Sequence, residues 1–284
     1  MRPFRLSPAH SLGLPALLVY ALVVIFPVIW ITYTSLKSDA EIFLAPFALP
    51  DPGSLHWENY GRAWTGARFS GYFFNSVLVC GVSLAGILLL SAMAAYALSC
   101  FRIRGGRLIF LTFLAGLMIP LQLALVPLFF QMRGLQLLNS RLGLILAYIA
   151  WGLPFAIFIL SGFFRSLPSS LYEAAIVDGC TEWRAFWHVM LPLARPGLVT
   201  VAVFSFLGLW NEYFMAFLFM SGAESEAVRT LPLGLGNISI TSQYRSEWGT
   251  AFAGLVLVTL PTMAFCLVLQ KHLVKGITTG ALKG

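Results

Sequence analysis

Charged residues are scarce in this sequence. The 284-residue chain is 59% hydrophobic and only 10% charged, whereas a soluble domain carries roughly 25% charged residues. This composition excludes an ordinary soluble enzyme or binding domain and predicts an integral membrane protein. The length fits one membrane domain with little room for a soluble one, so we expect a single transmembrane domain over residues 1–284.

Cysteine and histidine are also few, with four of each. No two of the four cysteines, Cys80, Cys100, Cys180 and Cys266, have the spacing of a disulfide or a metal site, so they are interpreted as small apolar side chains. No histidine lies within an apolar run beside a serine or cysteine, which disfavours a membrane enzyme. We therefore expect no catalytic residue, bound cofactor or metal in this chain.

The dipeptide Gly-Lys is absent from the sequence. A phosphate-binding P-loop requires it. The chain is thus not expected to bind nucleotide by itself, and any ATP-driven motor would have to be a separate subunit.

Long apolar runs are abundant, and six of them reach the roughly 20 residues that a membrane-spanning helix needs. They predict spans at about 12–34, 71–99, 108–132, 142–164, 197–223 and 248–270. Only the fifth contains an acidic or basic residue, Glu212. The first is longer than the apolar region of a signal peptide, so it is interpreted as a retained span.

The basic residues are distributed unevenly between the two ends of these spans. Eleven of the 18 lysines and arginines fall on the side of the two termini, where only three acids lie, and the other seven fall on the opposite side with seven acids. The positive-inside rule then places both termini in the cytoplasm. This topology explains the net charge of +7, which gives no case for nucleic-acid binding.

Two of the outer connections have contrasting features. Residues 35–70 contain several prolines and the interfacial aromatics Trp57, Tyr60 and Trp64, which predict a short amphipathic helix on the outer surface. Residues 224–247 contain Pro232, Gly234 and Gly236. Proline and glycine are typical of turns, so a loop rather than a buried element is predicted there.

The inner connection 165–196 carries helix boundary signals. Ser170 and Glu173 have the spacing of a capping box, and Gly179 stands where a left-handed residue ends a helix. These signals predict a two-turn helix over 171–178. Thr181 is predicted to cap a second helix that runs to about Met190, where Leu191-Pro192 and then Pro196 would end it.

A two-turn helix is not stable alone and must pack against something. One interpretation is a connector between two spans. The other is a docking helix that fits a cleft in a soluble partner, with Ala174 and Ala175 allowing close approach of the backbone. The full spacing of the loop favours docking.

The residues Glu173-Ala174-Ala175, Asp178-Gly179, Phe186 and Leu191-Pro192-Leu193 resemble the signature loop of permease subunits of ABC importers. Nearly the whole chain resembles the maltose-permease-G-like subunit of the carbohydrate branch. The further segments that carry this resemblance are Thr34-Ser35-Leu36-Lys37, Glu58-Asn59-Tyr60, Trp210-Asn211-Glu212-Tyr213 and the tail from Gln270 to Gly284. Cys180 departs from the family, which more often has alanine there.

This resemblance implies an all-α ABC importer type I permease fold with six transmembrane helices in a bacterial inner membrane. It implies four kinds of partner: a second, maltose-permease-F-like permease subunit, two ATPase subunits that bind ATP and Mg, an extracytoplasmic solute-binding protein, and a sugar substrate such as a di- or oligosaccharide. The chain would form half of the translocation pathway. A permease for a non-sugar solute remains an alternative.

In such an importer the helix 170–179 would be the coupling helix, seated in a groove of one ATPase subunit. Glu173 and Asp178 would pair with basic groups there, Ala174 and Ala175 would give close contact, and Gly179 would allow the turn. Ser170 is expected to cap this helix.

Ionisable residues within a span indicate function by default. Glu212 is expected in the outer half of the bilayer, where it could contact substrate or serve a structural or gating role. The other polar or aromatic candidates for the pathway or its gate are Trp210, Asn211, Asn75 and Gln122, for which interhelical packing is the alternative. A secondary transporter is disfavoured because only Glu212 is available for ion coupling.

Overall fold

The computed structural model describes residues 8–245 and 247–281, and these residues form helices and turns with no strand. The chain divides into two compact units. The first comprises Met1–Phe69 and Leu235–Leu260, and the second comprises Ser70–Gly234 and Pro261–Gly284.

Four helices are long and apolar enough to cross a membrane: α1 (Pro8–Thr34), α4 (Phe69–Cys100), α7 (Arg141–Ser166) and α14 (Trp248–Ala281). Two further candidates are bent pairs. Helices α5 (Gly106–Gly116) and α6 (Leu121–Gly134) meet at 101°, and the helical segment Glu182–Leu193 meets α11 (Arg195–Trp210) at 73°. With each pair counted once, the described residues provide up to six spans, and the predicted all-α class is confirmed.

Two of the predicted spans are nevertheless not continuous helices. The predicted span 108–132 breaks before Pro120, whose extended backbone (φ −62°, ψ 135°) starts α6. The predicted span 197–223 ends at Trp210, and a short helix, α12 (Phe214–Phe219), follows after a turn. Apolar composition alone does not reveal such breaks, because both sides of each break remain apolar.

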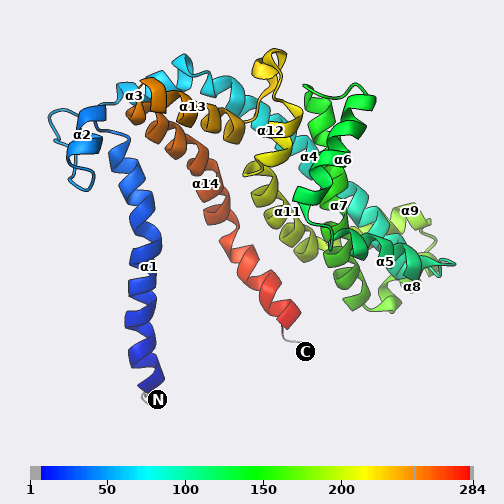
Figure 1. Cartoon of the computed structure of the whole chain (residues 1–284). Helices are drawn as coiled ribbons and strands as arrows, with labels where there is room; N and C mark the ends of the chain where they lie inside the picture. The colour runs from blue at the N-terminus through cyan, green and yellow to red at the C-terminus, as the bar shows by residue number, and fades with distance from the viewer. Residues whose placement is uncertain (1–7, 246, 282–284) are drawn as a thin grey trace. The chain divides into compact units, whose positions relative to one another are not determined.

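In the first unit, two short helices gather at the end of α1, namely α2 (Asp39–Leu44) and α3 (Glu58–Gly61), the latter continued by a π turn, Arg62–Gly66 (Figure 1). Helix α2 begins with a capping box. The Ser38 hydroxyl accepts from the Glu41 N–H at 3.3 Å, and the Ser38 N–H donates to the Glu41 carboxylate at 2.8 Å. The outer connection 35–70 is therefore helical in two short pieces.

Buried polar groups hold these pieces to the end of α1. The Lys37 side chain is only 1% exposed, and its Nζ donates to the carbonyls of Ala45 at 2.9 Å and Pro46 at 3.4 Å. The amide of Asn59 donates to the carbonyls of Ser35 at 2.9 Å and Lys37 at 3.0 Å. The segment around Lys37 and the segment around Asn59 thus form one hydrogen-bonded structure. We call it the outer lock (Ser35, Lys37 and Asn59).

The first turn of α14 completes the outer lock. The Gly249 N–H donates to the Asp39 carboxylate at 2.8 Å. Gly249 also lies so close to the Asn59 amide that a Cβ there would come within 2.5 Å of it. Glycine is required because no larger residue fits against Asn59 without a shift.

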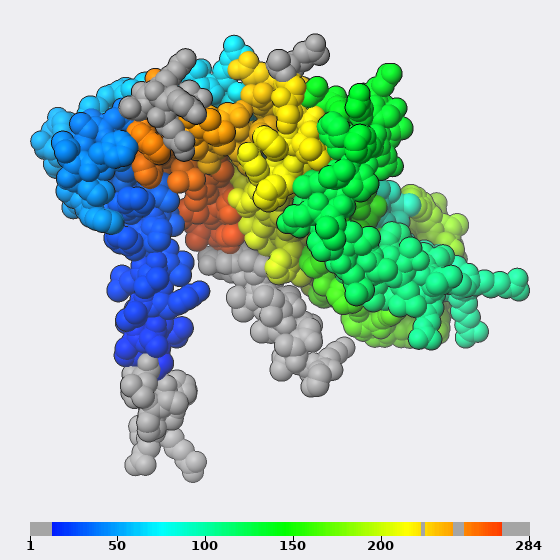
Figure 2. Space-filling model, in the orientation of Figure 1, coloured from blue at the N-terminus to red at the C-terminus, as the bar shows by residue number. Residues whose placement is uncertain are grey.

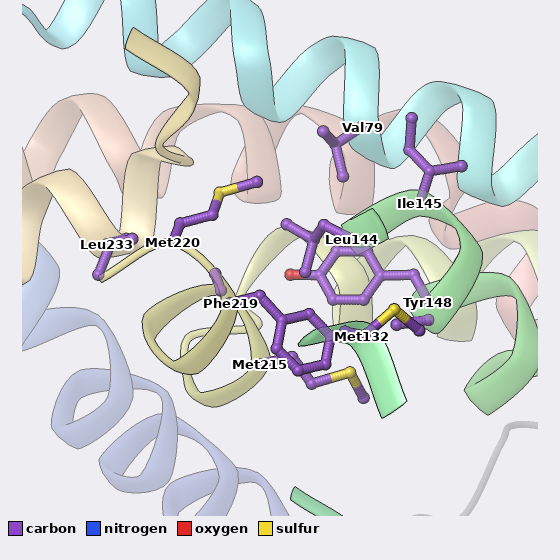
Figure 3. Close-up of a cluster of buried hydrophobic side chains, with 11 residues drawn as sticks. Val79, Met132, Leu144, Ile145, Tyr148, Met215, Phe219, Met220 and Leu233 are labelled. Atoms are coloured by element: carbon purple, nitrogen blue, oxygen red, sulfur yellow. The ribbon is translucent and has the colours of Figure 1, made fainter. Parts of the chain in front are cut away.

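The second unit has two apolar clusters. One joins α4, α6, α7 and α12, and Figure 3 shows the Tyr148 ring among the apolar side chains of this cluster, Leu144 and Met132 included. The other cluster packs the helices of the inner connection against α4 and α7 through Tyr96, Phe164 and Phe186. The described helices of the inner connection therefore share an apolar core with α4 and α7.

The connection 224–247 was predicted to be a loop, and this prediction is wrong. A 3₁₀ turn (Ala223–Val228) leads into the helix α13 (Leu231–Arg245). Pro232 is the second residue of α13, where its missing N–H is not needed. Gly234 lies directly against the Tyr72 ring, where a Cβ would not fit. Proline and glycine here serve a helix start and a close contact instead of a loop.

Candidate functional site

The helix α8 (Ser169–Val177) occupies the place of the predicted docking helix. Its N-cap is Pro168, with an extended backbone (φ −58°, ψ 128°), and no side chain caps it. The predicted capping box of Ser170 and Glu173 is therefore wrong. Because Pro168 starts the helix earlier than predicted, Ser170 is already its second residue and does not occupy the extended N-cap position that this bond requires.

The end of α8 is as predicted. Gly179 is left-handed, with φ 82°. Its N–H donates to the Ile176 carbonyl at 3.0 Å, and the Cys180 N–H donates to the Ala175 carbonyl at 3.0 Å. This pair of bonds is a Schellman motif, which stops the helix sharply. A side chain at Gly179 would have open space around it but an unfavourable backbone conformation.

The predicted cap of the second helix is confirmed, because the Thr181 hydroxyl accepts from the Arg184 N–H at 3.3 Å. The helix continues as α9 (Glu182–Ala185), a π turn (Phe186–Met190) and α10 (Leu191–Leu193). It thus runs through Pro192, contrary to the prediction that Leu191-Pro192 ends it. The wider π turn just before the proline relaxes the clash that its ring would otherwise make with the preceding turn.

The side chains of α8 divide into an exposed and a buried face. Glu173, Ala174, Asp178 and Gly179 are exposed, as docking requires. Ala175 is only 6% exposed and packs within the chain. The expectation that Ala175 offers close contact to a partner is therefore not met, whereas Ala174 is open.

Large apolar side chains are also exposed on this segment. Val177 is 85% exposed and Trp183 is 57% exposed. We call the exposed set the docking surface, and it comprises Leu171, Glu173, Ala174, Ile176, Val177, Asp178, Gly179 and Trp183. Exposed apolar side chains beside carboxylates, on helices too short to cross a bilayer, are typical of a protein-binding surface.

An anchor that the sequence did not indicate holds the docking surface in place. The Tyr172 hydroxyl donates to both Glu182 carboxylate oxygens, at 2.7 and 2.9 Å, and the Tyr96 hydroxyl of α4 lies 3.4 Å from the same carboxylate. The Tyr96 ring also lies 5.1 Å from that of Phe186. We call Tyr96, Tyr172 and Glu182 the inner anchor; it connects α8 and α9 to a long span.

Desolvation, with the hydrogen bond to Glu182 and its charge, raises the pKa of Tyr172 to about 12. The hydroxyl therefore remains a donor at neutral pH. Sequence reasoning missed this anchor because its two donors come from residues 10 and 86 positions away from Glu182, separations that follow no local pattern.

Glu212 lies at the break in the fifth predicted span. Its carboxylate accepts from the Tyr148 hydroxyl at 2.7 Å and from the backbone N–H groups of Met215 at 2.8 Å and Ala216 at 3.1 Å. Glu212 therefore caps the start of α12. Without it, the first N–H groups of this helix would be unpaired in apolar surroundings. Of the roles predicted for Glu212, this geometry favours the structural one.

Glu212 and Tyr148 also line a cavity of ≈ 320 Å³ in the second unit. Its wall includes the aromatic residues Trp151, Phe155 and Phe204. A few polar groups in a mostly apolar and aromatic pocket are the usual composition of a small-molecule site. Such a wall suits a sugar ring, which has apolar C–H faces and hydroxyl edges.

The other candidates for the pathway lie elsewhere. Trp210 is 2% exposed and stacks on Phe206 with ring centroids 5.6 Å apart. The Asn211 amide donates to the Leu207 carbonyl at 2.9 Å. Gln122 is exposed on α6 and does not line the cavity. Trp210 and Asn211 directly precede Glu212 in the chain, but neither of them lines the cavity.

Asn75 makes hydrogen bonds that connect three segments of the chain. Its amide donates to the carbonyls of Ala227 at 3.0 Å and Arg229 at 2.9 Å, and its oxygen accepts from Arg141 Nε at 2.9 Å. Asn75 thus ties the 3₁₀ turn to α4 and α7. Within the residues that the structure describes, no group of three or more His, Cys, Asp or Glu could hold a metal ion.

Comparisons with known proteins agree with this architecture. The sequence profile of the binding-protein-dependent transport system inner membrane component matches residues 71–279. A diacetylchitobiose uptake system permease of Streptomyces coelicolor is 43% identical, over 94% of this chain and 87% of the relative. A trehalose transport system permease of Mycobacterium tuberculosis is 36% identical, over 92% and 93%.

Two solved structures are also similar. A chain of a bacterial ABC transporter involved in the import of the acidic polysaccharide alginate superposes with a TM-score of 0.80 at 26% identity, covering 95% of this chain and 99% of that one. A chain of a bacterial alginate transporter in complex with a pentasaccharide-bound periplasmic protein gives 0.65 at 14% identity, over 91% of both, and supports the fold alone.

Proposed function

The chain belongs to the family of binding-protein-dependent transport system inner membrane components, and from this premise we propose that it is a permease subunit of an ATP-driven sugar importer. The relatives named for diacetylchitobiose and trehalose, together with the structural neighbour that imports alginate, support a carbohydrate substrate. The chain would form half of a translocation pathway, completed by a second permease subunit.

The observation that carries this proposal is the docking surface. It comprises a sharply terminated helix, α8, and Trp183 of α9, with exposed apolar and acidic side chains, and hydrogen bonds among Tyr96, Tyr172 and Glu182 hold it to a long span. A soluble ATPase bound to this surface could move the connected span as a rigid body. Rigid-body movement of this kind is one way in which transporters switch between states. ATP and Mg would be bound by two such ATPase subunits.

We place the docking surface and both termini on the cytoplasmic side of a bacterial inner membrane, because the excess of arginine and lysine lies there. An extracytoplasmic solute-binding protein would deliver the sugar from the other side. The cavity that Glu212 and Tyr148 line is the proposed sugar contact of this subunit, with Trp151 and Phe204 as stacking faces and Glu212 as the cap that holds α12 beside it.

The experiment is purification of the tagged chain from its native host in mild detergent, with mass spectrometry of the proteins that accompany it. We expect a second permease and a P-loop ATPase. A chain that purifies as a homo-oligomer without an ATPase would contradict the importer assignment.

Gly179→Val and Glu173→Lys refine this test. Both are expected to insert normally but to uncouple sugar uptake from ATP hydrolysis. The matched control is Gly105→Val, because Gly105 is also left-handed (φ 77°), has open space around it and lies outside the docking surface. Normal uptake by both docking variants would contradict the coupling role.

A further inference from the structure

A second cavity in the same unit is lined mostly by basic and apolar side chains. It has a volume of ≈ 480 Å³ and lies between the turn after α4, the start of α5 and the end of α7. Three arginines line it, Arg102 and Arg107 from the turn and helix start and Arg165 from the end of α7. Phe101 and Phe110 contribute its apolar wall.

The three arginines converge without a counter-charge. The Arg165 guanidinium lies over the Phe110 ring, 4.9 Å from its centroid, a cation–π contact that positions it. In the described part of the chain, both ion pairs found involve Glu58 and neither involves these arginines. Three cations gathered around one concave site create a local positive potential that favours an anion.

A helix N-terminus adds to this potential. Helix α5 has 11 residues and no side-chain cap, and its first residues Gly106 and Arg107 line the cavity. The Gly106 N–H already donates to the Ile103 carbonyl at 3.0 Å. The helix start therefore contributes mainly the positive end of its dipole to the site, which favours a phosphate group.

The surface next to the cavity is apolar. Leu108, Ile109 and Leu111 are exposed along α5, which belongs to one of the bent candidate spans. Figure 2 shows the blue-green segment that contains α5 at the surface of the molecule. A soluble anion would contact only the arginines, whereas a phospholipid would contact the arginines with its phosphate and the apolar face with its acyl chains.

We propose that this cavity binds the phosphate of an anionic phospholipid from the inner leaflet, with the acyl chains along α5. Basic pockets between helices on the cytoplasmic side are suited to such headgroups. Arginine is well matched to the phosphate because its planar fork can donate two hydrogen bonds at once. The proposal rests on the proposed orientation, in which this side faces the cytoplasm.

The test uses the assembled importer, stripped of lipid in detergent and titrated with phosphatidylglycerol or phosphatidylcholine, with bound lipid counted by native mass spectrometry. We expect saturable binding of phosphatidylglycerol and weaker binding of phosphatidylcholine. The triple variant R102Q/R107Q/R165Q should lose at least about tenfold in apparent affinity for phosphatidylglycerol. Equal binding of the two lipids, or an unchanged triple variant, would overturn the proposal.

A pair of single variants keeps the test valid if the triple variant fails to insert. Arg107 lines the cavity and Arg104, three residues earlier in the same basic segment, does not. We expect R107Q to weaken phosphatidylglycerol binding several-fold and R104Q to change it by less than about twofold. Equal effects of the two would mean diffuse attraction without a site.

Inorganic phosphate separates the two possible sources of the anion. We expect it to displace phosphatidylglycerol only weakly, because it cannot contact the apolar face of α5. Displacement at the same concentration as the lipid would overturn the assignment to a phospholipid. Co-purification of the ATPase, scored in the same samples, reports on the proposed function independently of lipid binding.

Discussion

The outer lock and the docking surface are built from similar parts but differ in which side chains they bury. Both consist of short helices at the end of a long span. In the outer lock the polar groups of Lys37 and Asn59 are buried and bonded to backbone carbonyls. On the docking surface the apolar side chains of Val177 and Trp183 are exposed. The first region satisfies its own groups, whereas the second leaves apolar surface that a partner would cover.

The largest effect is expected from breaking the outer lock with Asn59→Leu. The substitution keeps the branched shape of the side chain but removes the donor to the carbonyls of Ser35 and Lys37, which would be left buried without it. Unpaired buried groups of this kind cost about 1–3 kcal/mol each. We expect a clear drop in thermal unfolding temperature in detergent and in yield.

Asn211→Leu is the matched control for that prediction. Asn211 is exposed, and its amide donates within one helix turn to Leu207. The control should shift the unfolding temperature much less than Asn59→Leu. Equal shifts would mean that the outer lock is not the more stabilising of the two contacts.

An intermediate effect is expected from Val177→Asp on the docking surface. Because Val177 is exposed, the folded chain alone should unfold at nearly the same temperature. Burying a new charge in an interface is unfavourable, so association with the ATPase should weaken by about tenfold or more. Co-purification at several salt concentrations measures this loss, and unchanged association would remove Val177 from the interface.

The smallest effect is expected from Tyr172→Phe in the inner anchor. Removing one hydrogen bond to the Glu182 carboxylate should cost about 0.5–1.5 kcal/mol of stability. Folding raises the pKa of Tyr172 from about 10 to about 12. The stabilisation is therefore fully present below about pH 10 and is lost as the pH rises towards 12. Thermal unfolding of both proteins at pH 7 and at alkaline pH checks this sign.

The parts that could be predicted from sequence are those set by local chemistry. Gly179 and Thr181 act through bonds to residues within a few positions, and both do so as predicted. The apolar runs likewise indicate up to six spans, since length and composition decide that property. The coupling roles of Glu173 and Asp178 remain predictions, because they depend on a partner.

The parts that could not be predicted depend on competing or distant contacts. Ser170 fails as a cap because Pro168 starts the helix first. Residues 231–245 form a helix in which Gly234 packs against Tyr72, and a contact between residues so far apart in the sequence cannot be predicted from local composition. The inner anchor joins residues 86 positions apart, and no local pattern indicates such a pair.

The contact of Tyr148 with Glu212 has a consequence for how the protein enters its membrane. A carboxylate within a span opposes insertion, by up to about 2.5–3.5 kcal/mol on insertion scales for charged residues such as Asp at the helix centre. Tyr148 precedes Glu212 by 64 residues and is made first. The hydroxyl that donates to Glu212 is therefore synthesised before the carboxylate that it accommodates, and its hydrogen bond offsets part of this penalty.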